Sequence, residues 1–301
     1  MAKRRRRSKK KSNPIVTIIV FILFIAGVIY TRTGPLVEEK GREVPPDSQL
    51  MVYFLDVGQG SSTLIQSGTS GVLIDAGETE YGDDVCSFIE EVGITKLEYV
   101  VATHPHSDHI GGLPQVLEKF GVGTVYAPEL AERTVPTTRI YENFLDAVAQ
   151  SGAQAKYAKV GDEFTFGGAY FRILGPVEQL DDLNNMSVII RMVYGETEMM
   201  FVGDAENEEM QTLCDYGGNH NADVYLMGHH GSSTSIHKEF LARVSPSIAV
   251  ISCGEGNSYG HPHREALEYI EKNNLTCLRT DTDGCITFTC MADGFTYETE
   301  R

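Results

Sequence analysis

Three histidines and one aspartate lie within six residues of the segment HPHSDH, namely His104, His106, Asp108 and His109. The segment follows an apolar run at 99–103 and precedes a Gly-Gly pair, so it is expected to be a loop after a strand. Imidazole nitrogens and carboxylate oxygens are ligands of Zn²⁺ and similar transition metals. Residues two apart in an extended backbone lie on one side, so His104 and His106 are expected to share one ion, and the other two residues can turn toward a second.

Three more polar segments follow expected strands. Asp204 in FVGDAE could bridge two ions, although an aspartate at a strand end often only caps a turn. In MGHHGSS the adjacent His229 and His230 point apart; strand-end geometry favours His229 as the ligand and leaves His230 beside it or facing substrate. His261 and His263 in NSYGHPH, with Tyr259 beside them, are expected at the same cleft.

An α/β fold is expected to position these residues, because strand-length apolar runs alternate with helical segments from Leu50 onward. The expected strands are at 51–57, 62–66, 72–75, 99–103, 124–127, 170–174, 188–194, 199–202, 224–227, 248–252 and 286–290. The expected helices are at 83–92, 113–120, 139–151, 207–214, 236–244 and 264–273. The segments 61–78 and 187–206 resemble each other, each being strand, turn and strand ending in Asp-Ala. Two similar halves are therefore expected to face each other, with polar loops at the carboxyl ends of the strands.

The N-terminus has the pattern of a membrane anchor. Eight of the first eleven residues are basic, and 15–30 contains no charged residue. We expect a basic cytoplasmic tail at 1–14, a transmembrane signal anchor at 15–31, a linker at 32–49 and a catalytic domain at 50–301 that lies outside the cell membrane. The apolar run is short for a hydrocarbon core of about 30 Å, and a cleaved signal peptide or a buried helix are the alternatives.

The charge of the chain restricts its partners. The formal net charge is −17, and without the N-terminal basic run the body carries 17 basic and 42 acidic residues, or −25. Such a body gives no electrostatic support to non-specific nucleic-acid binding, so an anionic substrate needs local cations. The six cysteines could pair outside the cell, but their connectivity does not follow from the sequence. A hairpin turn at 281–284 would place Cys277 and Cys290 diagonally on neighbouring strands, and no bridge is predicted.

The motifs, taken in order, resemble the metallo-β-lactamase superfamily. FLDVGQG, VVATHPHSDHIGGL, FVGDAE, GHHGSS, NSYGHPH and TDTDGCI look more narrowly like the extracellular metallo-hydrolase domain of the DNA-uptake protein ComEC and its free-standing relatives. The resemblance implies an αββα sandwich with two divalent ions, zinc first and manganese as the alternative, and hydrolysis that is often of phosphodiesters. It assigns one ion to His104 and His106, the second to Asp108, His109 and His229, and the bridging position to Asp204.

Two departures from the superfamily pattern stand out. The usual histidine before the bridging aspartate is missing, and its segment offers only Asp181, Asp182, Asn184, Asn185 and Ser187. One metal site is therefore expected to be weak, open or ligated by oxygen. Ser61 stands after GQG where relatives carry aspartate. No multi-span region accompanies the domain, so the chain is not expected to form a DNA channel itself.

The sequence thus predicts a membrane-anchored extracellular metal-dependent hydrolase, first a phosphodiesterase or nuclease, with an anionic diester such as DNA as substrate. A bound cation lowers the pKa of water toward about 7 and supplies a hydroxide. Asp108 or Asp204 is expected to orient that nucleophile, and His230 or His261 to bind the oxyanion or protonate the leaving group. One alternative is a hydrolase of amides, thioesters or other carbonyl compounds. Another is a non-catalytic module of a DNA-uptake or envelope assembly.

Overall fold

The computed structural model describes residues 48–301. Residues 48–215 and 220–301 belong to one compact unit. The expected tail and anchor, and nearly all of the expected linker, lie outside the described residues. Within 48–301 every helix is too short or too polar to cross a membrane.

Eight strands form the first sheet, in the order β15-β14-β1-β2-β3-β4-β5-β6. Their bounds are β1 Leu50–Phe54, β2 Thr63–Ser67, β3 Ser70–Ile74, β4 Lys96–Val101, β5 Gly121–Ala127, β6 Gln154–Tyr157, β14 Ile286–Met291 and β15 Gly294–Thr299. Strands β15 to β3 pair antiparallel, and β3 to β6 pair parallel. The carboxyl ends of the parallel strands therefore lie along one edge of the sheet.

Seven strands form the second sheet, in the order β13-β12-β11-β10-β9-β8-β7. They are β7 Glu163–Phe166, β8 Ala169–Gly175, β9 Ile189–Tyr194, β10 Thr197–Phe201, β11 Val224–Leu226, β12 Ile248–Ile251 and β13 Thr276–Arg279. Strands β7 to β10 pair antiparallel, and β10 to β13 pair parallel. This sheet thus repeats the mixed arrangement of the first.

The main core lies between the two sheets. It consists of the inward side chains of both, with Phe54 of β1 against Phe201 of β10 at 6.1 Å between ring centroids. Along β14 buried and half-buried residues alternate strictly, as expected for a strand with one face on a core. Burying two inner faces in this way is what stabilises a sandwich of sheets.

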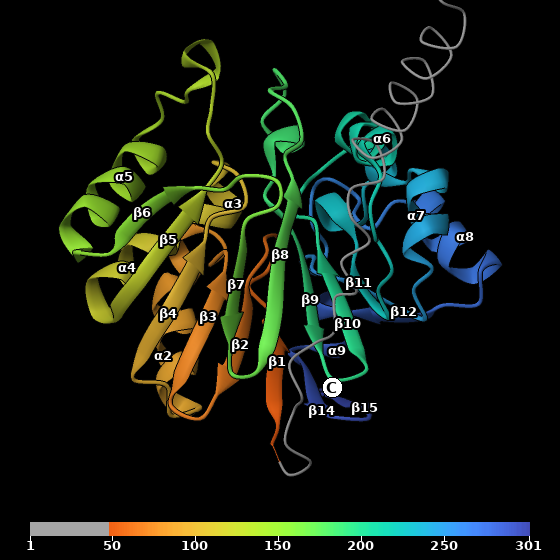
Figure 1. Ribbon diagram of the computed structural model, residues 1–301, viewed down its shortest axis with the longest axis horizontal. Coiled ribbons are helices and arrows are strands. Elements are labelled where there is room, and N and C mark those ends of the chain that lie inside the picture. The colour runs from red at the N-terminus through yellow and green to blue at the C-terminus, as the bar shows by residue number, and fades with distance from the viewer. Residues whose placement is uncertain (1–47) are drawn as a thin grey trace, which may run out of the picture. The chain divides into compact units, whose positions relative to one another are not determined.

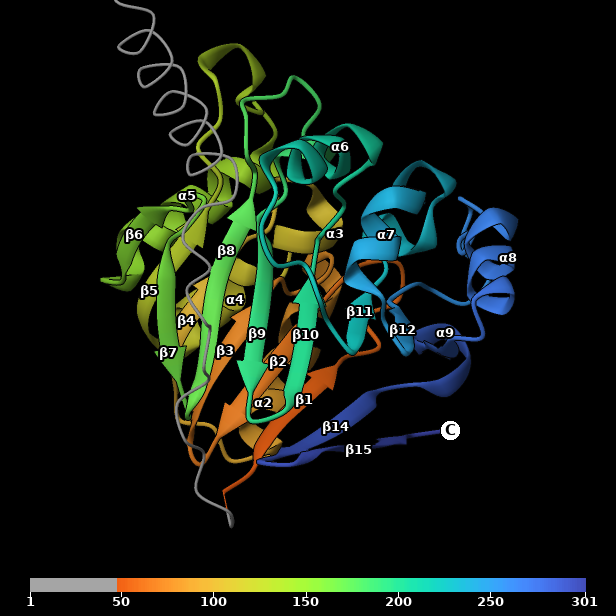
Figure 2. The ribbon, with the colours of Figure 1, turned by 45° about the vertical axis from the view of Figure 1, so that its right-hand side comes forward.

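The outer face of each sheet is covered by helices, on opposite sides of the sandwich (Figures 1 and 2). On the first sheet these are α2 Gly82–Glu91, α4 Leu113–Lys119 and α5 Arg139–Ser151. On the second they are α6 Asn207–Tyr216, α7 Lys238–Val244 and α8 Arg264–Lys272. The remaining short helices are α3 Ser107–Ile110, α9 Thr280–Asp283 and the 3₁₀ turns Thr79–Tyr81, Glu132–Thr134, Asn184–Met186, Gly228–Gly231 and Ser233–Ser235. The predicted α/β class with two facing sheets is confirmed.

Residues 281–284 do not form a hairpin turn, the arrangement under which Cys277 and Cys290 would lie on neighbouring strands. Strand β13 pairs with β12 in the second sheet, whereas β14 pairs with β1 in the first. Helix α9 carries the chain from one sheet to the other, so Cys277 and Cys290 lie in different sheets. All six cysteines are free thiols.

The predicted internal repeat is present. The hairpin of β2 and β3 is followed by Asp75, and the hairpin of β9 and β10 is followed shortly by Asp204. Each half then continues through a helix into a parallel strand whose carboxyl end releases histidines. The two halves therefore bring their polar loops to corresponding strand ends.

Candidate metal centre

The first group of metal donors consists of His104, His106 and Asp204. Their donor atoms all lie within 4.8 Å of one another. His104 is fully buried after β4, and its Nε2 lies 3.0 Å from Nδ1 of His106 and 3.7 Å from Oδ2 of Asp204. The structure therefore brings His104 and His106 together with Asp204 as possible donors to one ion.

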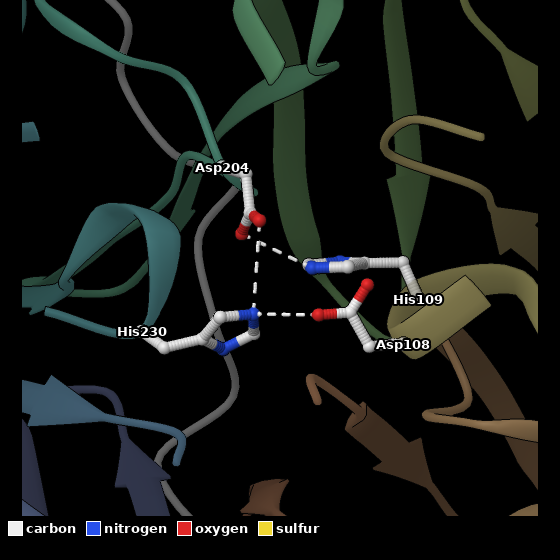
Figure 3. Close-up of side chains that lie close together, drawn as sticks. All are labelled: Asp108, His109, Asp204 and His230. Carbon is white, nitrogen blue, oxygen red and sulfur yellow. Dashed lines mark hydrogen bonds and ion pairs between the residues drawn. The ribbon is translucent and has the colours of Figure 1, made fainter. Parts of the chain in front are cut away.

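The second group consists of Asp108, His109, Asp204 and His230, whose donor atoms also lie within 4.8 Å of one another. Figure 3 shows these four side chains pointing toward a common centre. His109 Nε2 lies 3.1 Å from Asp204 Oδ1, and His230 Nε2 lies 3.1 Å from Asp108 Oδ2 and 3.6 Å from Asp204 Oδ2. Asp204 belongs to both groups, as a bridging ligand must.

Two of the donor atoms are buried and lack hydrogen-bond partners within residues 48–301, as expected for atoms that bind a metal ion. Among the described residues, Nε2 of His109 and Oδ1 of Asp204 are buried and have no partner with hydrogen-bond geometry, although they lie 3.1 Å from each other. A buried polar atom left unpaired costs about 1–3 kcal/mol, so such atoms in a donor cluster call for a ligand. Imidazole nitrogens with carboxylate oxygens are a donor set suited to zinc and neighbouring transition metals. The residues present therefore fit two cations that share Asp204.

Electrostatics hold most of the cluster in its ligating state. Burial and the nearby His109 keep the pKa of His104 well below its usual value, so this ring is neutral. Burial opposes ionisation of Asp204, but His109, His230 and His104 hold the pKa of this carboxyl well below its usual range. His109 behaves oppositely: although burial lowers its pKa, Asp204 and Asp75 raise it well above normal. A cation at the second group would displace that proton.

A carboxylate outside the cluster fixes His109. Asp75 Oδ2 lies 2.7 Å from Nδ1 of His109, and the same carboxylate accepts hydrogen bonds from the backbone and hydroxyl of Thr103 at 2.8 and 2.7 Å. An imidazole whose Nδ1 donates to a carboxylate presents Nε2 to the metal, which is the usual support of metal-binding histidines. No role was predicted for Asp75, although its repeat relationship to Asp204 was a signal for one.

His229 and His230 occupy the reverse of their predicted positions. Both residues have left-handed backbone, with φ of 50° and 56°. His230 is buried, and its Nδ1 donates to the backbone oxygen of Ser252 at 2.8 Å, which leaves Nε2 for the cluster. The ring of His229 is 25% exposed and its Nδ1 donates to Glu206 at 2.9 Å, while its Nε2 lies 3.7 Å from Asp204. The prediction of His229 assumed an extended strand end, and the left-handed turn removes that assumption.

The comparisons with known proteins agree with this geometry. The family model described as the metallo-beta-lactamase superfamily matches residues 55–255, which is most of the chain. The chain belongs to this superfamily. The match covers the histidine loop, Asp204 and both histidines of the turn after β11.

Two curated relatives of this superfamily member are proteins with competence-related names. ComE operon protein 3 of Bacillus subtilis is 31% identical over 259 residues, which cover 79% of this chain and 32% of that protein. Competence protein ComA of Neisseria gonorrhoeae is 30% identical over 271 residues, covering 89% of this chain and 35% of that protein. The chain thus spans about a third of the length of these ComEC-like homologues.

A solved metallo-beta-lactamase fold protein, YhfI from Bacillus subtilis, has the same fold. It aligns with a TM-score of 0.51 and 13% sequence identity, over 83% of this chain and 100% of that chain. At this identity the likeness concerns the fold, and it supports the two-sheet arrangement described above.

The segment that lacks the superfamily's usual histidine keeps one oxygen unpaired. Asp181 pairs with Arg133 on the surface. Asp182 Oδ1 accepts the backbone N–H of Asn184, Asn185 Oδ1 accepts that of Glu206, and Ser187 Oγ accepts that of Asp204. Within the described residues Oδ1 of Asn184 is buried without a partner, while its amide nitrogen donates to Glu206 Oε1 at 3.3 Å. Because a carboxylate can only accept hydrogen bonds, the amide nitrogen of Asn184 faces Glu206 and the amide oxygen faces away from it.

Ser61, which follows the GQG segment, contributes to the site through its backbone. Its N–H donates to the backbone oxygen of Asp108 at 3.0 Å. The approach is close enough that a Cβ on the preceding Gly60 would lie 2.6 Å from that same oxygen. The GQG segment therefore shapes the histidine loop through main-chain contacts and the absence of a side chain.

A cleft of about 530 Å³ opens over the donors. Asp108, Asp204, His229 and His230 line it, and so do His261 and Tyr259 from the loop after β12. His261 Nδ1 lies 3.3 Å from Nε2 of Gln59, and burial, with the neighbouring histidines, lowers the pKa of His261 to about 4. Six of the predicted site residues thus line one cleft, namely His106, Asp108, Asp204, His229, His230 and His261. His263 lies 4.7 Å from His261 between ring centroids.

Proposed function

We propose that this chain is a metal-dependent phosphodiesterase that acts on a nucleic-acid diester. The observation that carries the proposal is the sharing of Asp204 by two donor groups beneath one cleft. Superfamily members are typically metal-dependent hydrolases. Two cations held side by side suit a phosphodiester, because both the attacking and the leaving oxygen acquire charge. The competence-related names of the relatives support nucleic acid as the substrate class.

The protein residues would divide the work as follows. His104 and His106 would hold one cation, Asp108, His109 and His230 the other, and Asp204 both. When bound, zinc or manganese would polarise a phosphoryl oxygen and lower the pKa of water. Asp108 would also be placed to accept a proton from the attacking water. In this proposal His229 lines the cleft and is not a metal ligand. His230, for which the sequence predicted contact with substrate, would be a metal ligand instead.

His261 would act as a neutral hydrogen-bond donor. Oε1 of Gln59 accepts the backbone N–H of Gly254 at 3.2 Å, which directs its Nε2–H₂ toward Nδ1 of His261. A ring that accepts at Nδ1 carries its proton on Nε2. Because the pKa of about 4 keeps the ring neutral at pH 7, the residue suits stabilising an oxyanion better than protonating a leaving group.

The N-terminal sequence supports attachment of this enzyme to the cell membrane. We propose a single span at 15–31 with the basic tail in the cytoplasm and the catalytic domain outside, on the strength of the charge asymmetry across the apolar run. Protease added to intact cells should degrade the domain. Protection in intact cells with degradation after lysis would reverse the orientation.

The activity is tested with the full chain, loaded with zinc or with manganese. Bis-p-nitrophenyl phosphate and single-stranded DNA should be cleaved, and Asp204→Asn should abolish cleavage. Asp293→Asn, at an exposed position in the turn between β14 and β15, is the matched control and should be fully active. Thioester and β-lactam substrates run in parallel: cleavage of these alone would identify a carbonyl hydrolase. No cleavage with either metal would favour a non-catalytic module.

A further inference from the structure

One tyrosine that lines the cleft over the metal donors has an exposed side chain. Tyr259, in the loop at 252–263 between β12 and α8, is 67% exposed, the largest fraction among the exposed large apolar side chains of residues 48–301. Its hydroxyl makes no hydrogen bond within the described residues, and its ring lines the cleft. Neither core packing nor a polar contact therefore accounts for an aromatic ring at this position.

The ring is nevertheless held in a defined orientation. It stacks on His261 with an interplanar angle of 19° and 5.7 Å between centroids. His261 is in turn 6.0 Å from His230 and 5.4 Å from His229, measured between centroids. A row of rings thus leads from the donor cluster to Tyr259, whose outer face stays open to solvent.

The backbone of this loop is fixed by one side chain. Oδ1 of Asn257 accepts the backbone N–H groups of Tyr259 and His261 at 3.2 and 3.0 Å. Its Nδ2 donates to the backbone oxygens of Gly254 and His261 at 2.9 and 2.6 Å. The side chain of Asn257 is therefore used in full to present Tyr259, which lowers the entropy lost when a ligand binds there.

Within residues 48–301 the cleft offers an anionic polymer no lysine or arginine. Its lining among the described residues consists of histidines, carboxylates, Tyr259, apolar groups and uncharged polar side chains. The body of the protein is strongly acidic as well. Apart from cations at the donor cluster, binding must then come from contacts that do not depend on charge. Stacking of a base on an aromatic side chain strengthens binding without charge and works for every base.

We propose that Tyr259 is a stacking platform for a nucleobase of the strand whose phosphate lies at the donor cluster. This inference rests on the proposed phosphodiesterase function and names its substrate as a single-stranded nucleic acid. Bases in a duplex are already stacked on one another, so only an unpaired base can lay its face on the open ring of Tyr259.

Two diesters with the same leaving group test the platform in the metal-loaded full chain. Thymidine 5′-(p-nitrophenyl phosphate) carries a base and methyl p-nitrophenyl phosphate does not. Tyr259→Ala should raise KM for the thymidine ester at least about fivefold and leave KM for the methyl ester unchanged. Tyr259→Phe, which keeps the ring, should behave as the wild type. Tyr297→Ala, which removes a partly exposed tyrosine on β15, is the matched control and should change neither KM.

If both esters are cleaved and Tyr259→Ala changes the two KM values equally, or changes neither, Tyr259 is not a stacking platform. The proposed phosphodiesterase function would be unaffected by that result. Binding measured on the metal-loaded chain with phosphorothioate strands, which resist cleavage, keeps the test independent of catalysis. Fluorescence anisotropy should show tighter binding of oligo(dT) than of an abasic strand of equal length, and Tyr259→Ala should remove the difference. Equal binding of the two strands by the wild type, or no binding of either, would overturn the inference whether or not the esters are cleaved.

Discussion

Nδ1 of His229 lies 2.9 Å from Oε1 of Glu206, so a carboxylate holds this ring at the edge of the donor cluster. Glu206 is itself fixed by the hydroxyl of Thr234 at 2.8 Å and by the amide of Asn184. The adjacent His230 is instead buried among the donors. Two neighbouring histidines thus have different environments, and the difference can be measured.

His230→Ala is expected to reduce the bound metal from two ions per chain to one, because it removes a donor of the second group. His229→Ala should keep both ions, since His229 lies outside the two donor groups. Metal content after gel filtration, by mass spectrometry, decides between them. Loss of an ion in His229→Ala with full content in His230→Ala would restore the assignment made from the sequence.

The pairing of Asp75 with His109 predicts an effect of a residue that touches no ion. In Asp75→Asn the amide can donate to Nδ1 of His109, which moves the ring proton to Nε2 and blocks that atom as a ligand. Affinity for zinc should fall about 10- to 100-fold, the usual effect of losing such a support. Competition with a chromophoric chelator measures it, and Asp84→Asn on the exposed face of α2 is the control. Unchanged affinity would show that the hydrogen bond does not set the ring's protonation.

Most donors could be predicted from the sequence because each follows a strand and stands in a motif of unusual composition. The loop after β4 and Asp204 after β10 came from such signals. The choice between His229 and His230 could not be predicted from the sequence. It depends on the left-handed backbone of both residues, which local residue preferences do not predict. The support by Asp75 depends on a contact between residues 34 apart, which a single sequence does not show.

The elements that the sequence analysis missed share a physical cause. Strand β6 is exposed along its whole length and β15 along most of it, and both end the first sheet, so neither has the alternation that marks a strand. Strand β7 has only two buried residues and β13 one. Edge strands are stabilised by hydrogen bonding to a neighbouring strand more than by burial of their own side chains. The local sequence pattern does not show which strand that neighbour is.

Asn184 offers a test of the departure from the superfamily pattern. Its buried Oδ1 is the oxygen left unpaired in the segment where the histidine is missing. If this oxygen completes the His104 and His106 group, Asn184→Ala should make that ion dissociate about tenfold more readily in chelator. Asn184→His should favour zinc over manganese relative to the wild type, because imidazole replaces an oxygen donor. Metal competition followed by elemental analysis gives both results, with Asn143→His on the exposed face of α5 as the control.

Glu209 is a carboxylate buried away from the donors, in the first turns of α6. Its Oε1 accepts the backbone N–H of Val177 at 2.9 Å, and its Oε2 lies 2.9 Å from the hydroxyl of Thr212. Burial raises the pKa of Glu209 to about 7, more than these hydrogen bonds offset. The carboxyl is therefore partly protonated in the folded protein at neutral pH, while it is ionised in the unfolded chain.

This difference makes stability depend on pH in a defined direction. A group whose folded pKa is raised favours the folded state below its unfolded pKa, near 4.5, and loses that contribution as pH rises through about 7. The pKa difference of roughly 2.5 units corresponds to a full loss of about 3 kcal/mol. Glu209→Gln cannot ionise, and its amide can accept from Val177 and donate to Thr212, so it should match the wild type at pH 5 and be more stable at pH 8. Urea unfolding of the metal-free proteins gives the difference in unfolding free energy between variant and wild type at each pH. The histidines titrate in both proteins, so their contribution cancels in this difference. Equal pH dependence in variant and wild type would mean that Glu209 ionises at its ordinary pKa in the folded protein.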